Sequence, residues 1–239
     1  MSTERKVAVI TGASQGIGAG LVRAFRDRGC RVVATSRSIR PATDADLVTV
    51  QGDVGEAETA ETVFKAALDR FGRVDTLVNN AGIFMAKPFT AYSQHDYASY
   101  ISTNVTGFFH MTQHALDLMS KQGHGHVVTI TTSLVDQPMS SVPAALASLT
   151  KGGLSAATRA LAIEYARSGI RVNAVSPGII KTPMHPSEAH QALAALHPVG
   201  RMGEISDIAD AVLYLDGAGF VTGEVLHVDG GQAAGHHMP

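Results

Sequence analysis

A glycine-rich turn near the start of the chain has the composition of a phosphate-binding site. It reads TGASQGIG at residues 11–18, follows an apolar run of strand length and opens a helical pattern. Gly12 permits a tight turn, Gly16 lets the backbone approach a pyrophosphate, and Gly18 allows the helix to pack closely on a sheet. The free N–H groups and the positive end of that helix would then hold the phosphates.

Further short motifs follow in chain order. They are Asp53-Val54, Asn79-Asn80-Ala81-Gly82, Asn104, Ser176-Pro177-Gly178 with Thr182, and the closing HVDGG at residues 227–231. Together with the glycine turn, these segments resemble the short-chain dehydrogenase/reductase family over nearly the whole chain. The resemblance implies a nicotinamide dinucleotide cofactor and hydride transfer between that cofactor and a small-molecule carbonyl or alcohol.

The residues that the resemblance assigns to the cofactor come from several separate turns of the chain. They are Gly12, Ser14, Gln15, Gly16, Ile17, Gly18, Ser36, Arg37, Asp53, Val54, Asn80, Ala81, Gly82, Lys151, Pro177, Gly178, Ile180 and Thr182.

The end of the second predicted strand favours NADP(H) over NAD(H). NAD-selective sites place Asp or Glu there, because the carboxylate binds the ribose 2′-OH and repels a 2′-phosphate. This chain has Ser36 and Arg37 instead. Ser36 leaves room for a phosphate, and the charged guanidinium of Arg37 can donate two parallel hydrogen bonds to one. The alternative is that Arg37 is a solvated surface arginine.

The expected catalytic set lacks one member. The resemblance implies a catalytic set of Asn, Ser, Tyr and Lys, in which the tyrosine and the lysine stand four residues apart on one face of a helix. The lysine charge lowers the phenol pKa, so that the tyrosine can exchange the substrate proton. The resemblance assigns Asn104, Ser133 and Lys151 as catalytic residues, but Ala147 stands where the tyrosine is expected. No shift of one or two residues brings in a tyrosine.

Several groups could replace the missing phenol. Ser133 can hold a carbonyl oxygen, and removal of the ring predicts a polar, roomy space near Lys151 where a water could relay a proton. Tyr100 is a possible acid, although an aromatic residue there is more often a packing residue. His185 and His190 lie where a substrate lid is expected, with solvated loop histidines as the simpler interpretation.

Three functional interpretations therefore stay open: a slow or re-equipped oxidoreductase, a dinucleotide-binding protein without turnover, and an enzyme of another reaction class. We favour an NADP(H)-dependent oxidoreductase with an atypical active site. The alternative is a catalytically silent NADP(H)-binding protein with a regulatory or structural role. Lys151 either only holds the nicotinamide ribose or also drives the water relay, and we expect the relay.

The elements that must position these residues alternate between short β-branched runs and longer amphipathic stretches. This alternation predicts one doubly wound α/β domain over residues 1–239, with a parallel Rossmann-type sheet and helices on both faces. Strands are expected at 6–11, 31–36, 47–50, 75–78, 126–132, 171–175 and 224–228, and helices at 16–29, 56–71, 94–122, 144–168 and 205–215.

Composition excludes several other classes of function. The chain has 239 residues, a net charge of −2 and no basic cluster that would hold a nucleic acid or an anionic membrane. No apolar run approaches the ~18 residues that span a bilayer. The first six residues carry no signal-peptide core. The only cysteine, Cys30, is interpreted as a small buried hydrophobic residue. We therefore expect a cytoplasmic protein. His124 and His126 lack further ligands nearby, so no metal site is expected.

Two further expectations concern the pocket and the assembly. Phe84, Met85, Met139 and Met184 follow strand ends and would suit a moderately apolar substrate. Small residues in the helix at 144–168 would allow close helix pairing, and the resemblance implies a homotetramer, with a dimer as the fallback.

Overall fold

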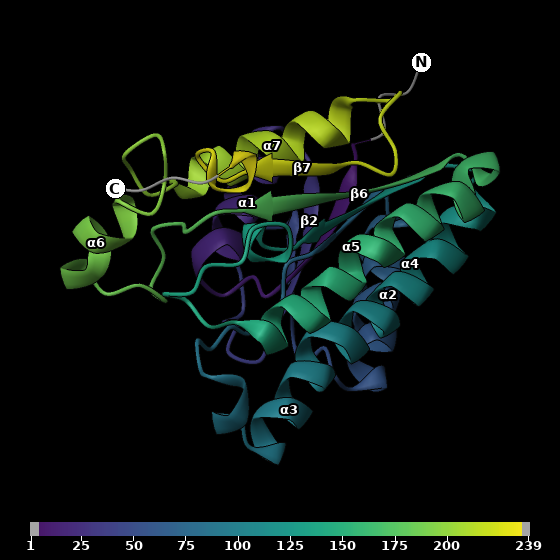
Figure 1. The fold of residues 1–239 in the computed structure, drawn as a ribbon. Coiled ribbons are helices and arrows are strands. Elements are labelled where there is room, and N and C mark those ends of the chain that lie inside the picture. The colour runs from purple at the N-terminus through teal and green to yellow at the C-terminus, as the bar shows by residue number, and fades with distance from the viewer. Residues whose placement is uncertain (1–4, 236–239) are drawn as a thin grey trace.

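Residues 5–235 are described by the computed structural model, so the signal-peptide prediction rests partly on residues 1–4, which lie outside the described range. The chain forms one parallel sheet of seven strands in the order β3-β2-β1-β4-β5-β6-β7 (Figure 1). The strands are β1 (Val7–Thr11), β2 (Arg31–Ser36), β3 (Leu47–Gln51), β4 (Thr76–Asn79), β5 (Gly125–Ile130), β6 (Ile170–Pro177) and β7 (Val225–Val228). The prediction of a doubly wound parallel sheet is confirmed.

Helices cover both faces of the sheet, because the strands are apolar on both sides. One face packs against α2, α4 and α5, which lie side by side, and the other packs against α1 and α7 (Figure 1). In β1, Val9 contacts the first layer while Ala8 and Ile10 contact the second, as alternating side chains must. The long helices are α1 (Gly16–Asp27), α2 (Ala57–Phe71), α4 (Gly107–Gln122), α5 (Ala145–Tyr165) and α7 (Ile205–Gly217).

The single helix expected at 94–122 is interrupted at its centre. α3 (Gln94–Tyr100) begins with a capping box between Ser93 and Asp96, and a π-helical segment, η2 (Ile101–Thr106), joins it to α4. π-helical turns are often found at functional sites, and this one contains Asn104.

Periodicity did not reveal the short helix α6 (His190–Ala194), which lies in the segment between β6 and α7. Within residues 5–235, no helix is both long and apolar enough to cross a bilayer.

The order of the strands reverses between β1 and β4, and in open α/β sheets ligands bind outside the strand ends at such a point.

Candidate active site

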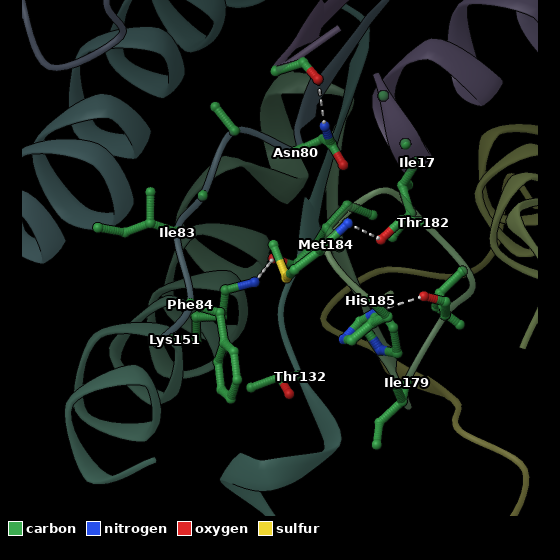
Figure 2. A pocket seen from close by; sticks show the side chains of 18 of the residues that line it. Ile17, Asn80, Ile83, Phe84, Thr132, Lys151, Ile179, Thr182, Met184 and His185 are labelled. Atoms are coloured by element: carbon green, nitrogen blue, oxygen red, sulfur yellow. Dashed lines mark hydrogen bonds between the residues drawn. The ribbon is translucent and has the colours of Figure 1, made fainter. Parts of the chain in front are cut away.

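A cavity of about 570 Å³ lies along the carboxyl ends of the strands. Every residue that the sequence assigns to the cofactor lines this cavity, from Arg37 beyond β2 to Thr182 beyond β6. Figure 2 shows the part of the cavity bounded by Phe84 and Lys151 on one side and by Thr182 and His185 on the other. Ser133 also lines it, whereas Asn104 does not.

The glycine turn has the shape that a pyrophosphate requires. Gly12 and Gly16 have φ angles of 65° and 56°, which side-chain-bearing residues rarely adopt. A Cβ on Gly18 would lie 2.2 Å from the carbonyl oxygen of Gly12, so only glycine lets the helix start this close to the turn. Asn80 holds the turn, because its amide donates to the oxygens of Thr11 and Gly12 at 2.9 and 3.2 Å.

The start of α1 leaves its backbone N–H groups available to a ligand. Gln15 is the N-cap residue, and no side chain caps the helix there. The first turn of α1 contains no acidic residue that would repel an anion. A helix start of this kind binds phosphate groups through its N–H groups and its dipole, so the residues present fit a dinucleotide.

The far end of the cavity combines hydroxyl groups with one arginine. Ser36 accepts a hydrogen bond from the Ser38 backbone N–H at 3.3 Å, and the Ser38 hydroxyl donates to Ser14 Oγ at 3.3 Å. The Arg37 guanidinium is largely exposed and lies 3.8 Å from the carboxylate of Asp53. Ser38, which the sequence analysis missed, therefore adds a third hydroxyl beside Ser14 and Ser36.

Lys151 lies at the opposite end of the cavity, next to the end of β5. Its ammonium donates hydrogen bonds to the carbonyl oxygens of Thr131 at 3.0 Å and Ile130 at 3.3 Å. Burial lowers the pKa of Lys151 to about 8, because the charged form loses its hydration. Two of its three N–H bonds are thus used by the backbone, which leaves one for a ligand.

The volume next to Ala147 is apolar, so the polar space expected near Lys151 does not extend to Ala147. Ala147 is fully buried and does not line the cavity. It packs in an apolar cluster with Tyr100 and Leu134, against which Phe84 and Met139 also pack. Apolar side chains from the connections after β4 and β5 therefore fill the volume beside this alanine.

A place for a single water occurs on the other side of Lys151, next to Asn104. A cavity of about 10 Å³ is lined by polar groups of Thr11, Asn79, Asn104 and Lys151 together with apolar neighbours. One water needs roughly 10–15 Å³ and several polar partners. Asn104 and Lys151 both line this small cavity, whereas Ala147 does not.

Asn104 uses its side chain to fix the loop that follows β4. Its Oδ1 accepts from the Ile83 N–H at 2.9 Å, and its Nδ2 donates to the Ile83 carbonyl at 3.3 Å and to Thr150 Oγ1 at 3.2 Å. The amide faces Ile83 and α5, which explains why it does not reach the large cavity.

Tyr100 does not lie where it could serve as the acid that the sequence analysis considered. Its hydroxyl accepts from the Met85 N–H at 2.6 Å and donates to the Met85 carbonyl at 3.2 Å. The ring is fully buried, and burial raises the pKa of Tyr100 to about 12.

Met85 itself was expected in the pocket, but it packs against the apolar cluster around Ala147, whereas Phe84, Met139 and Met184 do line the cavity.

Two neighbouring hydroxyls at the end of β5 differ in what they contact. Ser133 is 3% exposed, and its hydroxyl donates to Gln232 Oε1 at 2.9 Å. The orientation of that amide is set because Gln232 Nε2 donates to the Leu196 carbonyl at 3.2 Å. Thr132 is more exposed, lines the cavity and accepts a long hydrogen bond from the Leu134 N–H at 3.4 Å. Thr132 therefore retains a hydroxyl proton for a ligand, a property that the sequence did not distinguish.

His197 joins the covering helix α6 to the loop after β6. Its Nδ1 lies 3.0 Å from the carbonyl of Leu193, which can only accept, so this nitrogen carries the proton. Its Nε2 then accepts from the Ile179 N–H at 2.9 Å. His197 is 1% exposed, and burial lowers its pKa, which favours the neutral ring that this pair of bonds requires. Neither His197 nor Gln232 had a recognisable signal in the sequence.

The remaining sequence predictions have simpler outcomes. Cys30 is buried, as expected of a small hydrophobe. His126 is buried between Asn173 and Asp216, and His124 contacts Asp75. Among residues 5–235, no three His, Cys, Asp or Glu side chains are grouped as a metal ion would need.

Comparison with known proteins identifies the fold family. A family model described as enoyl-(acyl carrier protein) reductase matches residues 12–233. The 3-oxoacyl-(acyl-carrier-protein) reductase of Vibrio cholerae is 35% identical, over 97% of this chain and 98% of that protein. The 3beta-hydroxysteroid dehydrogenase 1 of Eggerthella lenta is 36% identical, over 95% of this chain and 93% of that protein. The chain belongs to the short-chain dehydrogenase/reductase family.

Solved structures of this short-chain dehydrogenase/reductase family agree with the fold. The structure of ElxO with NADP bound superposes with a TM-score of 0.91 at 29% sequence identity and covers 97% of this chain and 100% of that chain. The two relatives named above are a dehydrogenase and a reductase by name, and their names give different substrates. Family membership therefore gives the reaction type more firmly than the substrate.

Proposed function

We propose that this protein is an NADP(H)-dependent oxidoreductase that acts on a carbonyl/alcohol pair with an atypical active site. The observation that carries the proposal is the single cavity described above. It brings the glycine turn, Lys151 and the free hydroxyl of Thr132 into one space. An apolar end lined by Phe84, Met139 and Met184 continues from Lys151 and would take the substrate.

The cofactor is NADP(H). The turn at residues 12–18 would hold the pyrophosphate, and Ser36, Arg37 and Ser38 would hold the 2′-phosphate, with no carboxylate directly after β2 to repel it. When bound, the nicotinamide supplies or accepts the hydride. Lys151 has one N–H left for the ribose hydroxyls, so its first role is to position the cofactor.

The other residues act on the substrate or on the loop around it. Thr132 would donate a hydrogen bond to the carbonyl oxygen and stabilise the negative charge that develops there. Asn104 keeps the loop at Ile83 in place through its amide. Ser133 is directed to Gln232 and supports the wall of the cavity. Ala147 stands four residues before Lys151 and offers no proton, which makes the site atypical.

A catalytically silent NADP(H)-binding protein remains the second candidate, and the burial of Ala147 in an apolar cluster favours it. Two measurements separate the candidates. Fluorescence titration should show NADPH binding more tightly than NADH, and a panel of carbonyl compounds that includes ethyl acetoacetate should show NADPH oxidation. Tight NADPH binding without turnover above background would reject the enzyme in favour of the silent protein.

We propose that residues 1–239 form one domain and that four copies assemble. Exposed apolar side chains on α4 and α5, Phe109, Leu149 and Ile163, support contact between copies along these helices. Phe220, between α7 and β7, offers a second such position. Light scattering at micromolar concentration should return about four times the 25.0 kDa chain mass, and a value near 25.0 kDa would reject the assembly.

A further inference from the structure

Reduction of a carbonyl needs a proton for the oxygen, and few groups at the cavity can supply one. Four of its lining residues carry ionisable side chains: Arg37, Asp53, Lys151 and His185. Arg37 and Asp53 follow β2 and β3 and lie 3.8 Å apart at the far end of the cavity. Lys151 and His185 are thus the ionisable pair at the end where the substrate is proposed to bind.

Lys151 has no spare N–H once a cofactor is held. Two of its bonds are donated to Ile130 and Thr131, and the third is assigned to the ribose by the proposed function. Donation to the substrate would require one of these three bonds to break. The remaining ionisable group is His185.

The His185 ring is held in one orientation with one nitrogen free. Its Nδ1 lies 2.9 Å from the carbonyl oxygen of Ile180, which can only accept, so Nδ1 carries a hydrogen. The main chain of His185 is fixed on both sides, since its N–H donates to Thr182 at 3.0 Å and its carbonyl oxygen lies 3.1 Å from His190 Nε2. Nε2 is the atom left to act on a ligand.

His185 also lies on the correct wall of the cavity. Figure 2 shows its ring beside Ile179 and Thr182, on the side opposite Phe84 and Lys151, with Met184 between the two walls. A substrate bound against Phe84 and Met184 would therefore have Thr132 and Lys151 on one side and the imidazole on the other.

We propose that His185 is the general acid that replaces the missing phenol, an inference that rests on the proposed function. The imidazolium gives its Nε2 proton to the carbonyl oxygen as hydride reaches the carbonyl carbon. A C–H and an O–H bond form, the C=O π pair moves to oxygen, and the N–H bond at Nε2 breaks. The carbonyl is reduced and NADPH is oxidised to NADP⁺. Nδ1–H stays on Ile180 throughout, and a proton from water restores the acid.

The test separates proton transfer from hydride transfer. His185→Asn keeps an N–H donor near the position of Nδ1 for Ile180 but has no atom in place of Nε2. The matched control is His95→Asn, since His95 is exposed on α3 and does not line the cavity. Each variant is assayed with ethyl acetoacetate, which needs a hydride and a proton, and with 2-methyl-3,4-dihydroisoquinolinium, which needs a hydride only.

For His185→Asn, ketone reduction should fall roughly 10²- to 10⁴-fold, the usual contribution of a positioned acid, while iminium reduction and the NADPH Kd stay unchanged. His95→Asn should change neither rate. Equal losses for both acceptors in His185→Asn would overturn the acid role, as would an undiminished ketone rate. A wild-type protein that reduces neither acceptor would instead remove the proposed oxidoreductase function itself.

A readout without turnover completes the test. Nitrogen NMR of the ¹⁵N-labelled protein without ligand, recorded at a pH where the ring is neutral and with His185 assigned through the His185→Asn spectrum, should show the remaining ring proton on Nδ1. A neutral ring protonated at Nε2 would contradict the hydrogen bond to Ile180 and overturn the proposal.

Discussion

The Ser133 hydroxyl donates a 2.9 Å hydrogen bond to Oε1 of Gln232, a residue 99 positions later in the chain. This contact directs the proton of the expected catalytic serine toward the C-terminal turn. The neighbouring Thr132 is left as the hydroxyl with a proton for the cavity. The different roles of the Thr132 and Ser133 hydroxyls can be tested by substituting each residue.

Thr132→Val should lower kcat roughly 10²-fold, because it removes a donor to the developing oxyanion without changing the side-chain shape. Thr132→Ser keeps the hydroxyl and serves as the control, with a kcat close to that of the wild type. Ser133→Ala should leave kcat within a few fold and instead lower the free energy of unfolding by roughly 1–3 kcal/mol, since Gln232 Oε1 loses its donor. Steady-state kinetics measures kcat for each variant, and urea unfolding measures its free energy of unfolding. A large loss of kcat in Ser133→Ala with little loss in Thr132→Val would assign the oxyanion contact to Ser133.

Lys151→Met should weaken NADPH binding by about 10- to 150-fold, the value of a charged hydrogen bond of roughly 1.5–3 kcal/mol. With His185 as the acid, saturating NADPH should restore most of the turnover. The sequence alone favoured the opposite result, a loss that excess cofactor does not repair. Turnover measured against NADPH concentration decides between the two, since a persistent loss would support a proton relay through Lys151.

Ala147→Tyr should lower the thermal stability and give no gain in turnover. Ala147 is fully buried among Tyr100, Leu134 and Leu146, so an added ring must displace side chains that already fill the volume. Overpacking of this kind costs roughly 1–3 kcal/mol. A thermal melt beside the carbonyl assay tests this, and a faster enzyme with an unchanged Tm would mean that the space is open after all.

Arg37→Gln should weaken NADPH binding roughly 10-fold and leave NADH binding unchanged. The guanidinium is largely exposed, so solvent reduces the value of its contact with a phosphate. Arg40→Gln is the matched control, because Arg40 is exposed and does not line the cavity. Parallel fluorescence titrations are the measurement, and equal losses for both cofactors would place Arg37 outside a 2′-phosphate site.

His126 should make the fold sensitive to acid. Burial lowers its pKa from 6.5 to about 4, so the unfolded chain takes up the proton at a higher pH than the folded chain. Stability is therefore full above pH 6.5 and falls as the pH drops toward 4, by roughly 1.4 kcal/mol per pH unit. Urea unfolding of His126→Gln should show a flatter pH dependence in this range. The exposed His95→Gln should behave as wild type, and an unchanged slope for His126→Gln would exclude His126 as the cause.

The parts of the fold that the sequence predicted are those with a local cause. β-branched runs and turn residues placed the strands near their observed bounds, and the glycine turn needed no knowledge of distant residues. The helix expected at 94–122 contains a π-helical segment around Asn104, and the hydrogen-bond partner of Asn104, Ile83, is one that periodicity does not predict.

The parts that escaped prediction depend on distant contacts. Adjacent hydroxyls at residues 132 and 133 look alike in sequence, and only Gln232 distinguishes them. The volume beside Ala147 is filled from the loops that carry Phe84, Met139 and Val142, whose conformations no local pattern specifies. A missing side chain in a sequence thus does not establish an empty space in the fold.

The bond from His197 to Ile179 links α6 to the loop after β6. Leu193, on α6, lines the cavity, and Ile179 belongs to the loop beside the proposed nicotinamide site. Because His197 holds the carbonyl of Leu193 and the N–H of Ile179 at once, α6 cannot swing away without pulling on that loop. One ring therefore joins two parts of the cavity wall, and a substitution of His197 would release both of them at once.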